Sequence, residues 1–167
     1  GASRKEALKR YTSFSKGIGD GLDGLIVTGD NLELRKDCEP DKPVALPFEE
    51  ITYGPALKEI IDWARENVFS TIYSCLGSHF TLNHLYGVQR TIGESKVFGV
   101  FQHDITRYSK NPILQGMDDV ISAPHSRWGN IDSQELEDAG EKVLAENEKV
   151  GWLLAANENK AGGQDLF

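Results

Sequence analysis

The sequence is poor in cysteine and has no long hydrophobic run. Its 167 residues include 2 cysteines, Cys38 and Cys75, which are too few and too widely spaced for a disulfide framework or a cysteine-rich zinc site. There is no run of about 18 apolar residues, and the polar start Gly1–Glu6 lacks a signal-peptide core. These absences predict a soluble, cytoplasmic chain with no metal site and no membrane association.

Basic residues are also scarce relative to acidic ones. Lys and Arg total 18 against 26 Asp and Glu, which gives a formal net charge of −8 at pH 7. A field of this sign repels nucleic acid and anionic membranes, so neither is an expected partner. With 39% hydrophobic residues, the chain has enough apolar material for one core, and its length fits a single domain over residues 1–167.

Segments typical of strands and helices alternate along the chain. Strands are predicted at Leu25–Thr28, Thr71–Ser74, Val97–Phe101 and Val120–Ala123, helices from Pro55 to Val68, from Leu76 to Tyr86 and at Ser133–Ala139 with Ser133 as cap, and a hairpin from Lys142–Glu146 and Val150–Ala155. Three prolines interrupt residues 35–51, which we interpret as a surface insertion. The pattern predicts an α/β fold, a three-layer α/β/α sandwich with a mainly parallel sheet.

Cys75 lies directly between a predicted strand and a predicted helix. Residues at such a turn face the carboxyl edge of a parallel sheet, where ligands of open α/β folds bind. The unpaired N–H groups and positive dipole of the helix N-terminus favour a thiolate and can hold an oxyanion. Cys75 is therefore a candidate nucleophile, with the Leu76 N–H as an oxyanion donor. The alternative is a small buried cysteine that only fills space.

The wider sequence resembles a known family. The segments that carry the resemblance occur in this order: Asp23–Gly29, Asp62–Ala64, Ser70–Gly77, Leu85–Val88, Lys96–Val100, Gly116–Asp119 and Ala123–Arg127. Together they resemble the homoserine O-succinyltransferase/O-acetyltransferase family, which has a class I glutamine amidotransferase-like fold. The resemblance extends from about Leu22 to Ala156. It implies that Cys75 takes an acyl group from acyl-coenzyme A as a thioester and passes it to homoserine in methionine biosynthesis, with no bound cofactor.

The resemblance also assigns roles to other residues. It implies that Lys96 and Ser126 contact the substrate. Arg127, which flanks Ser126 and ranks below it, is suited by its own chemistry either to hold a carboxylate or to pair with a neighbouring acid. Glu33 occupies the position that selects the acyl donor, and its carboxylate would repel a succinyl group, so acetyl-CoA is the expected co-substrate. Without the resemblance, Lys96 is interpreted as an exposed lysine, Ser126 as a turn hydroxyl and Glu33 as a solvated acid.

The histidines rank below these residues. We expect His79 and His84 to point away from the sheet edge and to be structural. His103 ends a predicted strand and could approach the site, and His125 flanks Ser126.

The sequence departs from the family at several points. The family's general-base histidine belongs to a Gly-His-Pro-Glu segment, which does not occur here, and the sequence ends about where the strand carrying it should begin. The first strands of the family sheet are also not apparent before Leu25, while Leu76 and His79 replace the usual Trp and Gln. Unpaired sheet edges invite association, so we expect a homo-oligomer or a companion chain that supplies the missing strands.

Other functions remain open at this point. One is an incomplete or non-catalytic paralogue that acts as a binding or assembly module. A second is transfer to serine in place of homoserine, because one methylene gives little discrimination. A third is a cysteine hydrolase that releases ammonia from glutamine, as glutamine amidotransferases do.

Overall fold

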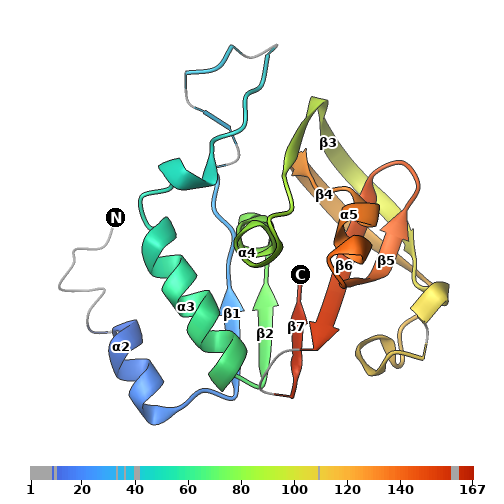
Figure 1. Ribbon diagram of the computed structural model, residues 1–167. Helices are drawn as coiled ribbons and strands as arrows, with labels where there is room; N and C mark the ends of the chain where they lie inside the picture. The colour runs from blue at the N-terminus through green and yellow to red at the C-terminus, as the bar shows by residue number, and fades with distance from the viewer. Residues whose placement is uncertain are drawn as a thin grey trace.

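A computed structural model describes residues 9, 11–32, 34–35, 37–39, 42–108, 110–158 and 162–167 (Figure 1). Its helices are α2 (Phe14–Gly17), α3 (Gly54–Asn67), α4 (Leu76–Tyr86) and α5 (Ser133–Asp138), with 3-10 turns η1 (Ile18–Asp20), η2 (Phe48–Glu50), η3 (Thr106–Tyr108) and η4 (Pro112–Leu114). The strands are β1 (Gly24–Val27), β2 (Ser70–Tyr73), β3 (Thr91–Asp104), β4 (Val120–Asn130), β5 (Lys142–Asn147), β6 (Gly151–Glu158) and β7 (Gln164–Leu166). Within the described part of the chain, none of the helices is long and apolar enough to cross a membrane.

Helices α3 and α4 form where the sequence predicts them. Pro55 lies in the first turn of α3, where its missing N–H costs nothing, and the helix buries Ile61 and Ala64 at helical spacing. Helix α4 is buried over its first seven residues and ends at Gly87, whose φ of 72° is left-handed. Ile61, Tyr73, Leu76 and Phe80 belong to one core cluster, so these helices pack on β2.

The seven strands form one mixed sheet in the order β1-β2-β7-β6-β5-β3-β4. Only the pairs β1–β2 and β2–β7 are parallel; β6–β7, β5–β6, β3–β5 and β3–β4 are antiparallel. The prediction of a mainly parallel sheet is therefore wrong. The reason is visible between β3 and β4, since η3 and η4 provide no crossover helix and parallel neighbours need one.

The layers also differ from a complete three-layer sandwich. Ile26 of β1 pairs with Ile72 of β2, and their exposed fractions are 65% and 42%. Among the residues that the structure describes, no helix covers this side of the two strands. The predicted cap of α5 is corrected as well: Asp132, not Ser133, is the N-cap residue, and its carboxylate accepts a hydrogen bond from the Gln134 N–H at 2.8 Å.

The described residues 34–35, 37–39 and 42–51, which lie between β1 and α3 in the chain, project from the sheet (Figure 1). Within the described part of this segment, Leu34 and Ala45 form an isolated antiparallel bridge. Arg35 pairs with Asp37 at 3.1 Å and with Glu50 at 2.8 Å. Ile51 at its end is buried in the main core, which anchors the segment at the start of α3.

Strand β7 lies between β2 and β6, at the place in the chain where a last strand is expected to begin. Asp165 of this strand is buried, and its Oδ2 lies 3.4 Å from Nε of Arg65 on α3. The side chains are 2% and 19% exposed. The ion pair therefore ties the central strand to the helix layer.

We expect Arg65→Leu to destabilise the fold by about 2 kcal/mol, because the Asp165 carboxylate loses a charged partner in a buried site. Lys58→Leu on the exposed face of the same helix is the matched control, expected within about 0.5 kcal/mol of the unmodified chain. Urea unfolding followed by circular dichroism measures both. Adding Asp165→Asn to Arg65→Leu should recover part of the loss, and equal midpoints for the two single variants would contradict this role.

Candidate active site

Cys75 occupies a sharp turn between β2 and α4. Its backbone has φ 56° and ψ −120°, and among the described residues it is the only non-glycine with positive φ. Such a conformation costs on the order of 1–3 kcal/mol and persists only where the surroundings enforce it. The same strand–turn–helix geometry presents the nucleophile of α/β hydrolases at the edge of the sheet. The side chain of Cys75 is exposed there.

Glycines on both sides make room for this turn. A Cβ atom at Gly29 would lie 2.7 Å from the Cβ of Cys75 and 3.2 Å from its Sγ. A Cβ at Gly77 would lie 3.0 Å from the Val27 carbonyl oxygen. Both positions are closer than ordinary contacts, so a side chain at either would displace the turn. The Gly24–Gly29 and Cys75–Gly77 segments are therefore fitted to each other at this edge.

A cavity of about 390 Å³ opens beside Cys75. Its walls come from the end of β2, the first turn of α4, the middle of β4, strand β6 and Phe167. The structure brings Ser126 and Arg127 to this cavity together with Cys75. Leu76 is the first residue of α4, and the first N–H groups of a helix have no intrahelical acceptor. A thiol and two polar residues of β4 thus line one cavity, next to the N-terminus of α4.

The guanidinium of Arg127 is held by the protein itself. Its Nε donates to Nδ1 of His125 at 3.1 Å, and Nη1 donates to the Gly129 carbonyl at 2.9 Å and to Oδ1 of Asn130. Nη2 donates to the carbonyl of Val150. These bonds clamp β4 to the β5–β6 turn, so in this conformation Arg127 acts on the cavity as a fixed positive charge.

His125 and His103 continue this chain of hydrogen bonds. His103 Nδ1 lies 3.1 Å from the Phe101 carbonyl, which can only accept, so His103 Nδ1 carries a proton. His125 Nε2 then donates to His103 Nε2, 3.1 Å away, and the two rings stack. Burial and the Arg127 charge lower the pKa of His125 to about 4. Both ring nitrogens of His125 already have hydrogen-bond partners, so His125 is not available as a general base. His103 is the next residue along this chain of hydrogen bonds.

His79 lines the cavity, contrary to the expectation that it points away. The backbone N–H of His79 donates to the Cys75 carbonyl at 3.2 Å. His79 therefore lies in the first turn of α4, on the same face of the helix as Cys75. Burial, together with the Arg90 and Arg127 charges, lowers its pKa to about 3. The spacing of four residues from Cys75 is the signal that places it on this face. His84, in contrast, contacts Asp62 of α3 at 2.8 Å.

Other predicted residues lie elsewhere. Lys96 is exposed in β3, where the pairing with β4 shifts register between Ile92 and Val97, and it does not line the cavity. Glu33 lies outside the described residues. Cys38 is half-buried in the projecting segment. In the described ranges, no group of three or more histidine, cysteine, aspartate or glutamate side chains is arranged to hold a metal ion.

Comparison with solved structures supports the fold. A Thermoplasma acidophilum protein described as a GMP synthase subunit matches with a TM-score of 0.59 and 17% identity, over 91% of this chain and 65% of that one. At this identity the likeness concerns the fold alone. It agrees with the expected glutamine amidotransferase-like architecture.

Sequence comparison identifies the relatives. A homoserine O-succinyltransferase of Alteromonas mediterranea is 36% identical over 90% of this chain and 45% of its own length. A homoserine O-acetyltransferase of Desulfitobacterium hafniense is 33% identical over 96% of this chain and 48% of its own length. The chain thus spans about half the length of these curated relatives. The family model described as homoserine O-succinyltransferase matches residues 2–163, and the chain belongs to this family of homoserine acyltransferases.

Proposed function

We propose that this chain carries the nucleophile of a homoserine O-acyltransferase, with Cys75 transferring the acyl group from acyl-CoA to the hydroxyl of L-homoserine. The main support for this proposal is the positive φ of Cys75, a residue at the mouth of a cavity in a chain of this family. Backbone strain of this kind clusters at functional sites, and at this turn it would present Sγ to an incoming carbonyl.

The reaction proceeds in two halves. The Cys75 thiolate attacks the thioester carbonyl of acyl-CoA, and the Leu76 N–H stabilises the oxyanion of the tetrahedral intermediate. Collapse expels coenzyme A as a thiolate, which takes up a proton, and leaves the acyl group as a thioester on Sγ. The homoserine oxygen then attacks this carbonyl and loses its proton to a base, and the Cys75 thiolate leaves with O-acylhomoserine formed.

For the acyl donor we propose acetyl-CoA. Relatives named as acetyl- and succinyltransferases match the chain about equally well. The preference rests on Glu33, whose carboxylate would repel the free carboxylate of a succinyl group but leave an acetyl group unaffected. For the same reason, Glu33→Gly is expected to admit succinyl-CoA.

The second half-reaction needs a general base, and no Gly-His-Pro-Glu segment occurs among the 167 residues. General-base catalysis contributes about 10²–10⁴-fold. We therefore expect the second half-reaction to be slow in this chain alone and to accelerate when a polypeptide with a His-x-Glu strand is added. A binding or assembly module without catalysis would show neither half-reaction.

The test is release of coenzyme A thiol and formation of O-acylhomoserine, followed by mass spectrometry with acetyl-CoA or succinyl-CoA as donor. We expect acylation from acetyl-CoA and transfer to L-homoserine in preference to L-serine. Ammonia release from glutamine, with no acyl transfer in the presence or absence of the companion polypeptide, would overturn the proposal in favour of a hydrolase.

A further inference from the structure

The floor of the cavity beside Cys75 is formed by the first turn of α4. Ser78 and His79 line it together with Cys75. Because helical side chains tilt toward the N-terminus, the ring of His79 leans back toward the turn that carries the thiol. Two polar side chains therefore lie directly beneath the space in which a substrate of Cys75 would sit.

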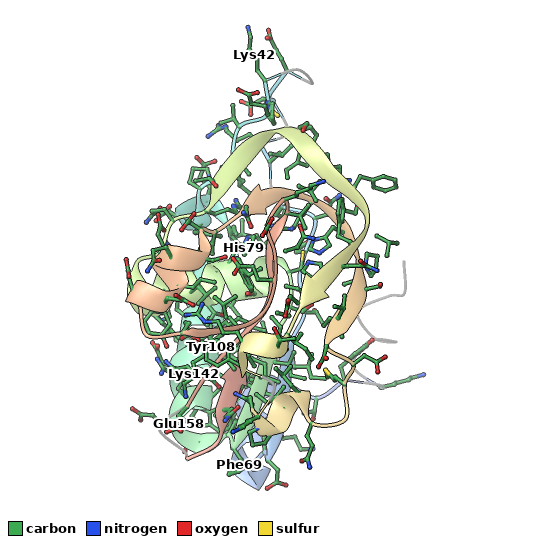
Figure 2. The ribbon with its side chains drawn as sticks, turned by 90° about the vertical axis from the view of Figure 1, so that its right-hand side faces the viewer. Lys42, Phe69, His79, Tyr108, Lys142 and Glu158 are labelled. Carbon is green, nitrogen blue, oxygen red and sulfur yellow. The ribbon has the colours of Figure 1, made fainter. Side chains whose placement is uncertain are left out.

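Both side chains are buried without a hydrogen-bond partner. Ser78 is 2% exposed and His79 is 7% exposed, and Figure 2 shows His79 in the interior of the molecule. Among the described residues, neither Oγ of Ser78 nor Nδ1 of His79 has a hydrogen-bond partner. An unsatisfied buried polar group costs about 1–3 kcal/mol, so native proteins rarely keep two side by side without a use for them.

The electrostatics of the cavity favour an anion. No Asp or Glu side chain is among the described residues that line it, although the chain as a whole carries a net charge of −8. The charges that act on the His79 ring are those of Arg90 and Arg127, both positive. With burial they keep the imidazole neutral, so it has one N–H to donate. The positive end of the α4 dipole adds to the same field.

We propose that Ser78 and His79 form a carboxylate subsite, in which the serine hydroxyl and the imidazole N–H donate to a carboxylate of a bound substrate. The hydroxyl moves between staggered χ1 positions and the ring turns about χ2, so each donor can face the cavity. A carboxylate satisfies both orphan groups at once. The fixed charge of Arg127 supports it without leaving its own partners.

Two substrates used within this family of acyltransferases carry a free carboxylate. One is the acceptor amino acid, through its α-carboxylate, and the other is a succinyl donor, through its distal carboxylate. This assignment of the source rests on the proposed function, whereas the affinity for a carboxylate does not. The experiments are therefore divided between binding and catalysis.

The binding experiment uses the whole chain with isotopically labelled histidine. L-Homoserine or succinate is added, and the ring resonances of His79 are followed by NMR as a function of pH. A carboxylate favours the charged form of the ring, so binding should raise the pKa of His79 from about 3. The amides of the same ligands lack the negative charge and should leave the pKa of His79 unchanged. If the amides raise the pKa of His79 as much as the acids do, or if no ligand raises it, the subsite does not exist.

Variants then separate the two groups. His79→Leu and Ser78→Ala should each weaken binding of the effective carboxylate by about 10–100-fold in calorimetry. His79→Gln keeps a donor and should retain part of the affinity. His84→Gln, on the same helix but away from the cavity, should bind as the unmodified chain does. A loss of less than about twofold in both His79→Leu and Ser78→Ala would overturn the proposal.

The effect of His79→Leu on the kinetics of each substrate shows which substrate places its carboxylate in the subsite. If His79→Leu raises KM for L-homoserine with little change in kcat, the acceptor occupies the subsite. If it slows acylation from succinyl-CoA more than from acetyl-CoA, the donor does. Carboxylate binding without acylation of Cys75 would refute the proposed function and leave the subsite standing. Acyl transfer by Cys75, together with unchanged carboxylate binding in His79→Leu and Ser78→Ala, would support the proposed function and refute the subsite.

Discussion

Replacing Cys75 with alanine is expected to abolish acylation of the chain by acetyl-CoA. Alanine has no nucleophilic atom, and loss of a nucleophile typically lowers the rate by roughly 10⁴-fold or more. In the unmodified chain the exposed thiol at the start of α4 should take up one acetyl group. Intact-mass spectrometry after mixing with acetyl-CoA measures the adduct directly.

Cys38→Ala is the matched control for this experiment. Cys38 is the only other cysteine and lies half-buried in the projecting segment, so its removal should leave the adduct unchanged. Peptide mapping should place the acetyl group on the segment that contains Cys75. An adduct that survives Cys75→Ala and disappears in Cys38→Ala would refute the assignment of the nucleophile.

The helices and the turn at Cys75 could be predicted from the sequence because the pattern that indicates each of them lies within one short segment. Pro55 and the apolar spacing that follows it predict α3, and Gly87 marks the end of α4. The order strand, Cys75, helix predicts the turn that the structure contains. In each case the signal that locates the element lies within a few residues, although the stability of the element depends on tertiary packing.

Sheet direction could not be predicted in the same way. Val97–Phe101 and Val120–Ala123 are β-rich in either orientation, because side-chain alternation does not depend on the direction of the partner. The absence of an amphipathic helix between them favours an antiparallel ribbon, and that signal was available. The extension of β3 to Asp104 and of β4 to Asn130 depends on their mutual pairing over long sequence separation.

The candidate site was partly predictable for a related reason. The motif Ala123–Arg127 brings Ser126 and Arg127 to the cavity, but only the structure shows that Arg127 donates to His125, Gly129 and Val150. Two of those acceptors lie on β4 itself, whereas Val150 lies in the β5–β6 turn, 23 residues further along the chain. The prediction that His79 points away from the sheet edge was wrong, because its ring lies at the cavity beside Trp152 of β6, with the two ring centroids 6.0 Å apart.

The second large effect is expected from a residue with no functional group. Gly29→Ala should slow acylation of Cys75 by about 100-fold, because displacing a reacting group by about 1 Å has a cost of this size. The new Cβ would lie 2.7 Å from Cβ of Cys75 and 3.1 Å from the Ser74 carbonyl oxygen, both fixed by the strained turn. The observed rate constant of acetyl adduct formation at saturating acetyl-CoA measures the effect.

Gly24→Ala, at the other end of β1, separates this clash from the general effect of replacing glycine. Its Cβ would meet only the Ser70 carbonyl oxygen, at an ordinary distance of 3.7 Å. Both variants reduce the entropy of the unfolded chain by a similar amount, so stability changes common to them cancel in the comparison. Equal acylation rates for Gly24→Ala and Gly29→Ala would show that the turn adapts to the extra methyl group. A rate lowered in Gly29→Ala alone, with an unchanged circular dichroism spectrum, would tie the reactivity of Cys75 to the close approach of β1.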